Sequence, residues 1–143
     1  MKKLLFVLAL FSLSVFAFAC GGSSSGGNPA ATGKTVGKAS VNNMTVTLAT
    51  ETGVLKNGAN DFTLTFADAS GKPVDVGAAS VNFFMPAMGS MAAMNDPATL
   101  TTSGTPGVYN GKVKLEMGGE WQVQIAYEGA AGKGKASFPI TAQ

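Results

Sequence analysis

Four methionines at a spacing of three residues are the part of this 143-residue sequence whose side chains could do distinctive chemistry. They are Met85, Met88, Met91 and Met94, in the segment MPAMGSMAAM. Thioether sulfur is a neutral, soft donor that selects copper(I), and silver(I), the heavier relative, should fit the same ligands. Because a thioether has no proton to lose, binding should vary little with pH. The segment therefore predicts a copper(I) or silver(I) site.

The same methionines also have a purely structural interpretation. Methionine is a flexible side chain that fills gaps in cores and at adaptable binding surfaces. Met85 follows two phenylalanines at the end of a predicted strand, so one of these three residues must point inward. A spacing of three alternates faces along a strand, so a single core could not take all four methionines. Pro86 and the pair Gly89 and Ser90 favour an irregular, turn-rich loop in which the chain folds back.

Two further residues are candidates for a place next to the metal. Met117 lies in the predicted turn EMGGEW and could approach from another loop. Trp121 could cover a bound cation with the face of its ring. The alternation of Trp121 with Val123 and Ile125, however, favours a place for the tryptophan in the core. The layer facing it should come from the preceding strand, through Tyr109, Val113 and Leu115.

Short stretches of alternating apolar and polar residues predict the strands that position this segment. The pattern is clearest at 44–51 and at 61–68, where it puts Phe62, Leu64 and Phe66 on one face. Further strands are expected at 79–86, 98–102, 107–116, 120–128 and 134–142. The connections are rich in turn-forming residues, and no stretch shows a sustained helical period. We expect an all-β fold, an immunoglobulin-like antiparallel sandwich of about seven strands.

The N-terminal segment has the order of a bacterial secretory signal. Lys2 and Lys3 precede a short apolar run, and small residues lead up to Cys20. The sequence AFAC resembles a lipobox, which predicts a signal peptide over 1–19 and lipidation of Cys20. Several acyl chains, at about 0.8 kcal/mol per buried CH₂, would anchor the protein stably in a membrane. Cleavage by an ordinary signal peptidase would instead leave a soluble protein with one free thiol.

The stretch after the cysteine is rich in glycine and serine and is predicted to be a flexible tether. The expected organisation is therefore a signal peptide over 1–19, the lipidated cysteine and tether over 20–37, and one folded domain over 38–143. Glycine at position 21 resembles lipoproteins that are sorted to an outer membrane. The predicted location is the bacterial cell envelope, anchored by lipid in the outer membrane and facing the periplasm.

The composition argues against two broad classes of function. Removal of the signal peptide leaves eight lysines against eight acidic residues, and these lysines are scattered, unlike the clustered basic surface of a nucleic-acid-binding protein. The chain has no histidine and no arginine, and Cys20 is its one cysteine. The commonest catalytic acids, bases and nucleophiles are therefore missing, and we do not expect an enzyme.

Motifs in the folded part occur in a recognisable order: NGANDFTLTFADASGKPV, VNFFMPAMGSM, PGVYNGKVKLEMGGEWQVQI and GKASFPI. This order resembles the YtkA-like, or FixH-like, domains of bacterial envelope proteins over roughly residues 44–141. The most specific element is MPAM followed by glycine. The resemblance implies an immunoglobulin-like β-sandwich in the cell envelope, beside copper-handling, terminal-oxidase assembly or metal-efflux systems.

Two functions from different classes follow from these observations. The first is a lipid-anchored copper(I) or silver(I) binder that buffers metal or delivers it to an envelope partner. The second is an interaction module that docks on an oxidase-assembly or metal-efflux membrane component through the same methionine segment. Substitution of Met88 and Met91 by leucine should abolish saturable metal binding, whereas a docking surface should tolerate the change.

Overall fold

The computed structural model describes residues 32–143, and these residues form nine strands without a helix. The strands are β1 Lys34–Val41, β2 Met44–Thr50, β3 Gly58–Ala67, β4 Ala78–Met85, β5 Met94–Pro97, β6 Thr99–Thr102, β7 Val108–Leu115, β8 Gly119–Gly129 and β9 Gly132–Ala142. The predicted all-β class is confirmed, with nine strands in place of about seven. In the described range, no helix is long and apolar enough to cross a membrane. The predicted signal peptide, Cys20 and most of the predicted tether lie outside the described residues.

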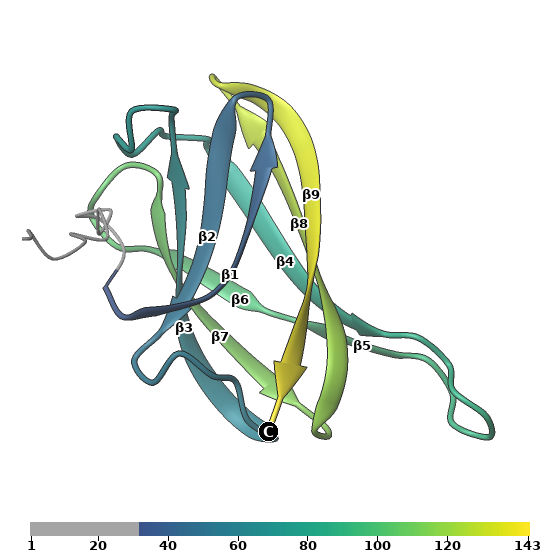
Figure 1. Cartoon of the computed structure of the whole chain (residues 1–143). Helices are drawn as coiled ribbons and strands as arrows, with labels where there is room; N and C mark the ends of the chain where they lie inside the picture. The colour runs from purple at the N-terminus through teal and green to yellow at the C-terminus, as the bar shows by residue number, and fades with distance from the viewer. Residues whose placement is uncertain (1–31) are drawn as a thin grey trace, which may run out of the picture.

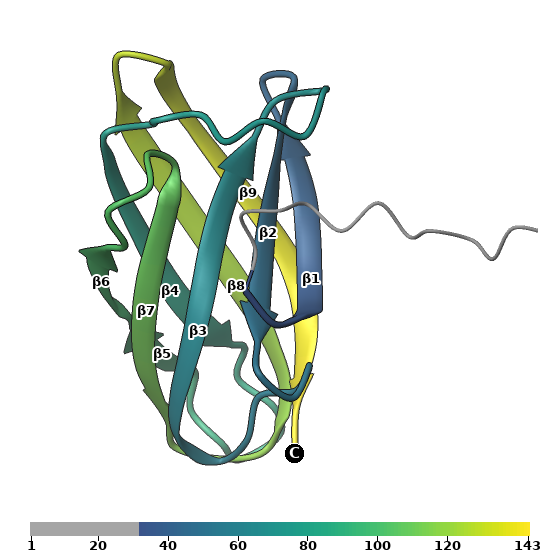
Figure 2. The same cartoon turned by 90° about the vertical axis from the view of Figure 1, so that its left-hand side faces the viewer.

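The strands form two antiparallel sheets that pack face to face. One sheet has the order β1-β2-β3-β7-β6, and the other has the order β5-β4-β8-β9. Figures 1 and 2 show the two layers from perpendicular directions, with β3 and β7 in one layer and β4 and β8 in the other. Strands β5 and β6 follow each other directly but belong to different sheets, and between them the Ala98 amide donates to the Val81 carbonyl at 2.9 Å. The predicted sandwich is confirmed.

Two strands were not predicted from the alternation of residues. Strand β1 begins at Lys34, four residues before the expected start of the domain, and it pairs with β2 through a turn at Asn42 and Asn43. Both asparagines have positive φ, 48° and 61°, which is the conformation of a type I′ hairpin turn. Strand β5 lies inside the methionine-rich region, which was expected to be an irregular loop.

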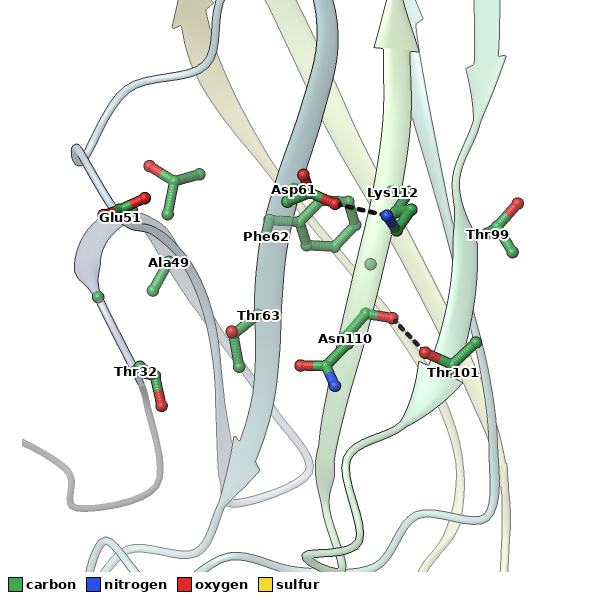
Figure 3. A pocket seen from close by; sticks show the side chains of 13 residues that line it. Thr32, Ala49, Glu51, Asp61, Phe62, Thr63, Thr99, Thr101, Asn110 and Lys112 are labelled. Atoms are coloured by element: carbon green, nitrogen blue, oxygen red, sulfur yellow. Dashed lines mark hydrogen bonds and ion pairs between the residues drawn. The ribbon is translucent and has the colours of Figure 1, made fainter.

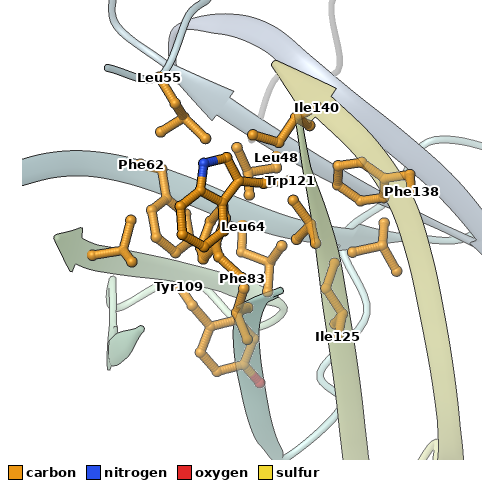
Figure 4. Close-up of a cluster of buried hydrophobic side chains, with 14 of the residues drawn as sticks. Leu48, Leu55, Phe62, Leu64, Phe83, Tyr109, Trp121, Ile125, Phe138 and Ile140 are labelled. Atoms are coloured by element: carbon orange, nitrogen blue, oxygen red, sulfur yellow. The ribbon is translucent and has the colours of Figure 1, made fainter. Parts of the chain in front are cut away.

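The core lies between the two sheets and is built from the inward-facing side chains of both (Figure 4). All the inward residues predicted for three of the strands are buried: Phe62, Leu64, Phe66, Tyr109, Val113, Leu115, Trp121, Val123 and Ile125. Edge-to-face aromatic pairs occur within and between the layers: Phe66 lies 5.8 Å from Tyr109 of the same sheet and 5.5 Å from Tyr127 of the facing sheet, between ring centroids. Such pairs add to the stabilisation from burial alone.

The hydroxyl of Tyr109 connects β7 in one sheet to the start of β4 in the other. It donates a hydrogen bond to the Gly77 carbonyl at 2.7 Å. Burial raises the pKa of Tyr109, and the nearby charge of Asp75 raises it further. The unfolded chain therefore ionises first, near the ordinary tyrosine pKa of about 10. The neutral Tyr109 hydroxyl therefore contributes fully to the free energy of unfolding below about pH 10. This contribution is lost as the pH rises through the higher pKa of the folded state.

We expect Tyr109→Phe to lower the free energy of unfolding by about 1 kcal/mol at neutral pH, because one hydrogen bond is lost and the ring is kept. The difference from the parent protein should shrink above about pH 10, where the parent loses its advantage. Urea unfolding followed by circular dichroism, across a pH series, measures this difference. A difference that stays constant across the series would contradict the assigned role of the hydroxyl.

Candidate functional site

The four methionines lie on the β4–β5 hairpin as two cross-strand pairs. Met85 is the register partner of Met94 at the ends of the paired strands. Met88 is bridged to Met91 at the tip, where the Met88 amide donates to the Met91 carbonyl at 3.1 Å and the Met91 amide donates to the Met88 carbonyl at 2.9 Å. Figure 1 shows this hairpin extending beyond the body of the sandwich. Methionines spaced three residues apart in the sequence are therefore paired across the two arms of the hairpin.

A two-residue turn of Gly89 and Ser90 produces this pairing. Gly89 has a φ of 57° at the first central position, as a type II′ hairpin turn requires. The prediction that the chain folds back within the segment is confirmed. The prediction of an irregular loop is wrong, because the segment is a regular hairpin. The turn lies at the centre of the methionine spacing, so residues equally far from it on both sides face each other.

The two pairs differ in their exposure to solvent. Met85 has 1% of its surface exposed, and Met94 is half-buried against the core. Met88 and Met91 are 49% and 40% exposed, and they are the two large hydrophobic side chains of residues 32–143 that stand out in solvent. Strand alternation puts the pairs on opposite faces of the hairpin. The structure thus brings Met88 to Met91 and Met85 to Met94, but it does not gather all four on one face.

Packing against the β7–β8 turn holds the base of the hairpin. Asp96 in β5 accepts a hydrogen bond from the Glu116 amide at 3.2 Å. A Cβ atom at Gly119 would lie 3.3 Å from the terminal methyl group of Met85, which places that methyl close to the start of β8. Met85 therefore belongs to the part of the hairpin that is fixed to the sandwich.

The two metal-adjacent candidates lie at this base and not at the tip. Trp121 has 1% of its surface exposed, and its indole Nε1 donates to the Met117 carbonyl at 3.1 Å. The favoured interpretation of Trp121 as a core residue is confirmed, and Figure 4 shows its ring among the other buried side chains. Met117 is half-buried and packs against the same core.

The hairpin carries no charge except that of Asp96 at its base. Residues 76–95 contain no aspartate, glutamate, lysine or arginine. On the outer face near the base, the Asn82 amide donates to Asn95 Oδ1 at 3.1 Å and to Gln124 Oε1 at 3.3 Å. Hard cations prefer carboxylate oxygen, and no group of three His, Cys, Asp or Glu side chains suited to a metal occurs in residues 32–143. The side chains of the tip therefore present two soft, neutral thioethers and the Ser90 hydroxyl, and no charged ligand.

A concave region, which the sequence did not indicate, lies over the outer face of the first sheet (Figure 3). Lys112 on β7 is paired with Asp61 on β3 at 3.2 Å, and both side chains are highly exposed. Thr101 donates to the Asn110 carbonyl at 3.4 Å. Exposed ion pairs of this kind contribute little to stability. Since the other lining residues are mainly threonine, alanine and glycine, we assign no chemistry to this groove.

Comparisons with known proteins place the chain in a family. Among solved structures, the chain is similar to a DUF4785 family protein from Legionella pneumophila, with a TM-score of 0.50 and 14% sequence identity. That match covers 71% of this chain and 28% of the other protein, so this chain spans less than a third of its structural relative, and the likeness concerns the fold alone. No curated protein matches the chain. A family profile described as YtkA-like matches residues 38–126, so the chain belongs to the YtkA-like family.

Proposed function

We propose that this protein binds copper(I) or silver(I) through Met88 and Met91, in order to buffer the ion or to deliver it to a partner in the envelope. One observation carries the proposal: two exposed methionine side chains form a cross-strand pair at the uncharged tip of the hairpin. The Cα atoms of such a hydrogen-bonded pair are about 5.5 Å apart. Methionine has three rotatable bonds, so both sulfurs can turn toward one ion while the backbone stays in place.

The site suits exchange better than storage. Its donors are neutral, so no charge attraction holds the ion, and both side chains are open to solvent. Thioethers also persist in an oxidising compartment, where thiolates would form disulfides. An ion held in this way can pass to a partner with stronger ligands. Met85 and Met94, which are held against the core, would support the hairpin and are not assigned as ligands.

The membrane is the second proposed partner. The lipobox-like AFAC and the glycine- and serine-rich stretch after it support a lipid-anchored domain in the bacterial envelope, at the outer membrane and facing the periplasm. A domain held there would meet metal-transport or oxidase-assembly proteins of the same compartment. We propose no catalytic role, for the reasons of composition given above.

Docking without metal is the alternative, and one feature of the hairpin favours it. The 20 residues from 76 to 95 are uncharged, and the exposed stretch from Pro86 to Ala93 is apolar except for Ser90. Methionine is common at adaptable binding surfaces. An oxidase-assembly or metal-efflux membrane component could bind the hairpin through such contacts alone.

Titration with copper(I) in competition with a chelator tests the proposal. The full chain carrying Cys20→Ser, in detergent, excludes the thiol as a competing ligand. We expect saturable binding that falls more than about tenfold, or about 1.4 kcal/mol, in Met88→Leu/Met91→Leu, because leucine keeps the volume and removes both sulfurs. Affinity should be equal at pH about 6 and about 8, since a thioether has no proton to lose.

The matched control is Met94→Leu/Met117→Leu, which also removes two methionines but leaves the tip intact. It should bind as the parent does. A parent protein that fails to compete for copper(I), or a tip variant that binds as well as the parent, would refute the metal site. Retained docking on an envelope membrane protein by the tip variant would then favour the alternative.

A further inference from the structure

We infer that the tip pair is half of a metal site and that a second copy of this chain supplies the other half. One copper(I) or silver(I) ion would then join two chains tip to tip through Met88 and Met91 of each. This inference rests on the proposed function, and it adds the partner and the stoichiometry.

The number of available donors is the first argument. Neutral thioethers are weak ligands, and a soft monovalent ion accepts three or four of them, whereas one tip supplies two. The other four methionines of residues 32–143 are held by the core: Met44 and Met85 are 7% and 1% exposed, and Met94 and Met117 pack against it. The sequence contains no histidine. The remaining coordination positions must therefore be filled from outside this tip.

The space around the tip is the second argument. The residues that flank the two methionines are small: Ala87, Gly89, Ser90 and Ala92. A Cβ atom built on Gly89 would meet no other atom within 4 Å. Since the hairpin extends beyond the sandwich (Figure 1), a second tip can approach without contact between the two bodies.

The absence of charge is the third argument, and it concerns identical partners in particular. In a two-fold contact, the same patch of both chains meets. Every charge on the patch would therefore be repelled by the identical charge on the second chain. The uncharged run of residues 76–95 removes this repulsion. Asp96, the first acid after the run, is at the base, where its carboxylate accepts the hydrogen bond from the Glu116 amide.

The contact should form only when metal is present. Two half-exposed methionines on each chain, with small neighbours, bury far less than the roughly 1,000 Å² that a stable protein interface needs. The ion must therefore hold the two chains together. The protein without metal is expected to be a monomer.

Silver(I) titration of the full chain carrying Cys20→Ser, in detergent, tests the inference by native mass spectrometry and sedimentation velocity. We expect one silver ion per two chains and conversion to dimer up to half an equivalent of silver. Excess silver should restore monomers, each with its own ion. The Met88→Leu/Met91→Leu variant should stay monomeric, and Met94→Leu/Met117→Leu should dimerise as the parent does.

Each other outcome has a defined meaning. One silver ion per chain at every ratio, with no dimer, would overturn the inference and leave the proposed function standing. No bound silver would overturn both. A dimer that forms without silver, or that persists in the tip variant, would overturn the inference because the contact would not depend on the shared ion.

Discussion

Replacement of Trp121 by alanine is expected to lower the free energy of unfolding by about 3–5 kcal/mol. The tryptophan is the largest of the fully buried side chains, and it packs between the sheets among residues from both (Figure 4). Alanine would leave a cavity, and it would also remove the hydrogen bond from the indole to the Met117 carbonyl. Domains are commonly stable by about 5–15 kcal/mol, so this one change would remove a large part of the total.

Urea unfolding followed by circular dichroism measures this loss, and Trp121→Phe separates its two causes. Phenylalanine keeps an aromatic ring in the core and removes only the indole hydrogen bond and part of the volume. Its loss should be clearly smaller than that of alanine. If Trp121→Ala does not fold, the phenylalanine variant still gives a measurable stability. A loss below about 1 kcal/mol for Trp121→Ala would show that the site carries far less packing than the burial implies.

Gly111→Ala is expected to be the second most damaging change, although it adds a single methyl group. Gly111 in β7 is the register partner of Phe62 in β3, and the phenyl ring covers it. A Cβ atom at Gly111 would lie 2.2 Å from Cζ of Phe62, far inside van der Waals contact. The backbone of Gly111 is not in the left-handed region, so alanine adds no backbone strain there. The loss of stability should therefore come from the collision alone. Overpacking of this kind costs about 1–3 kcal/mol.

A double-mutant cycle with Phe62→Leu identifies the collision as the cause. Leucine lacks the ring atoms that meet the new methyl group, so Gly111→Ala should cost much less in the Phe62→Leu background. The expected coupling is between about 0.5 and 3 kcal/mol. Phe62→Leu alone also removes the edge-to-face contact with Phe83, whose centroid is 5.9 Å away. Strictly additive losses in the cycle would contradict the assignment.

The strands that could be predicted are those in which long apolar side chains alternate with polar ones. Strand β3 has Phe62, Leu64 and Phe66 on its inner face, and β8 continues the same period from Trp121. Strand β1 gives a weaker pattern because it is a half-exposed edge strand with a register shift next to Gly37, where a Cβ atom would lie 2.5 Å from the Phe138 ring. The register shift and the glycine allow β1 to pack closely against Phe138, and they also interrupt the alternation of apolar and polar residues in its sequence.

The candidate site could be predicted in its residue types but not in its arrangement. Methionine sulfur as the proposed donor follows from composition alone, and the small residues between the methionines indicated that the chain folds back. The position at which the hairpin extends past the sheet determines which pair of methionines is exposed to solvent. Met85 lies before this position and is in the core, whereas Met88 lies beyond it. Spacing along one strand contains no information on this.

In the tetrapeptide Met-Gly-Ser-Met, residues 88–91, the two methionines are paired by the positive φ of Gly89 and by two backbone hydrogen bonds that all lie within the tetrapeptide. A unit encoded so locally should be portable. Grafted onto the two-residue turn of an unrelated hairpin, it should present the same pair of exposed methionines, whereas one residue inserted into the turn would shift the register and separate the pair.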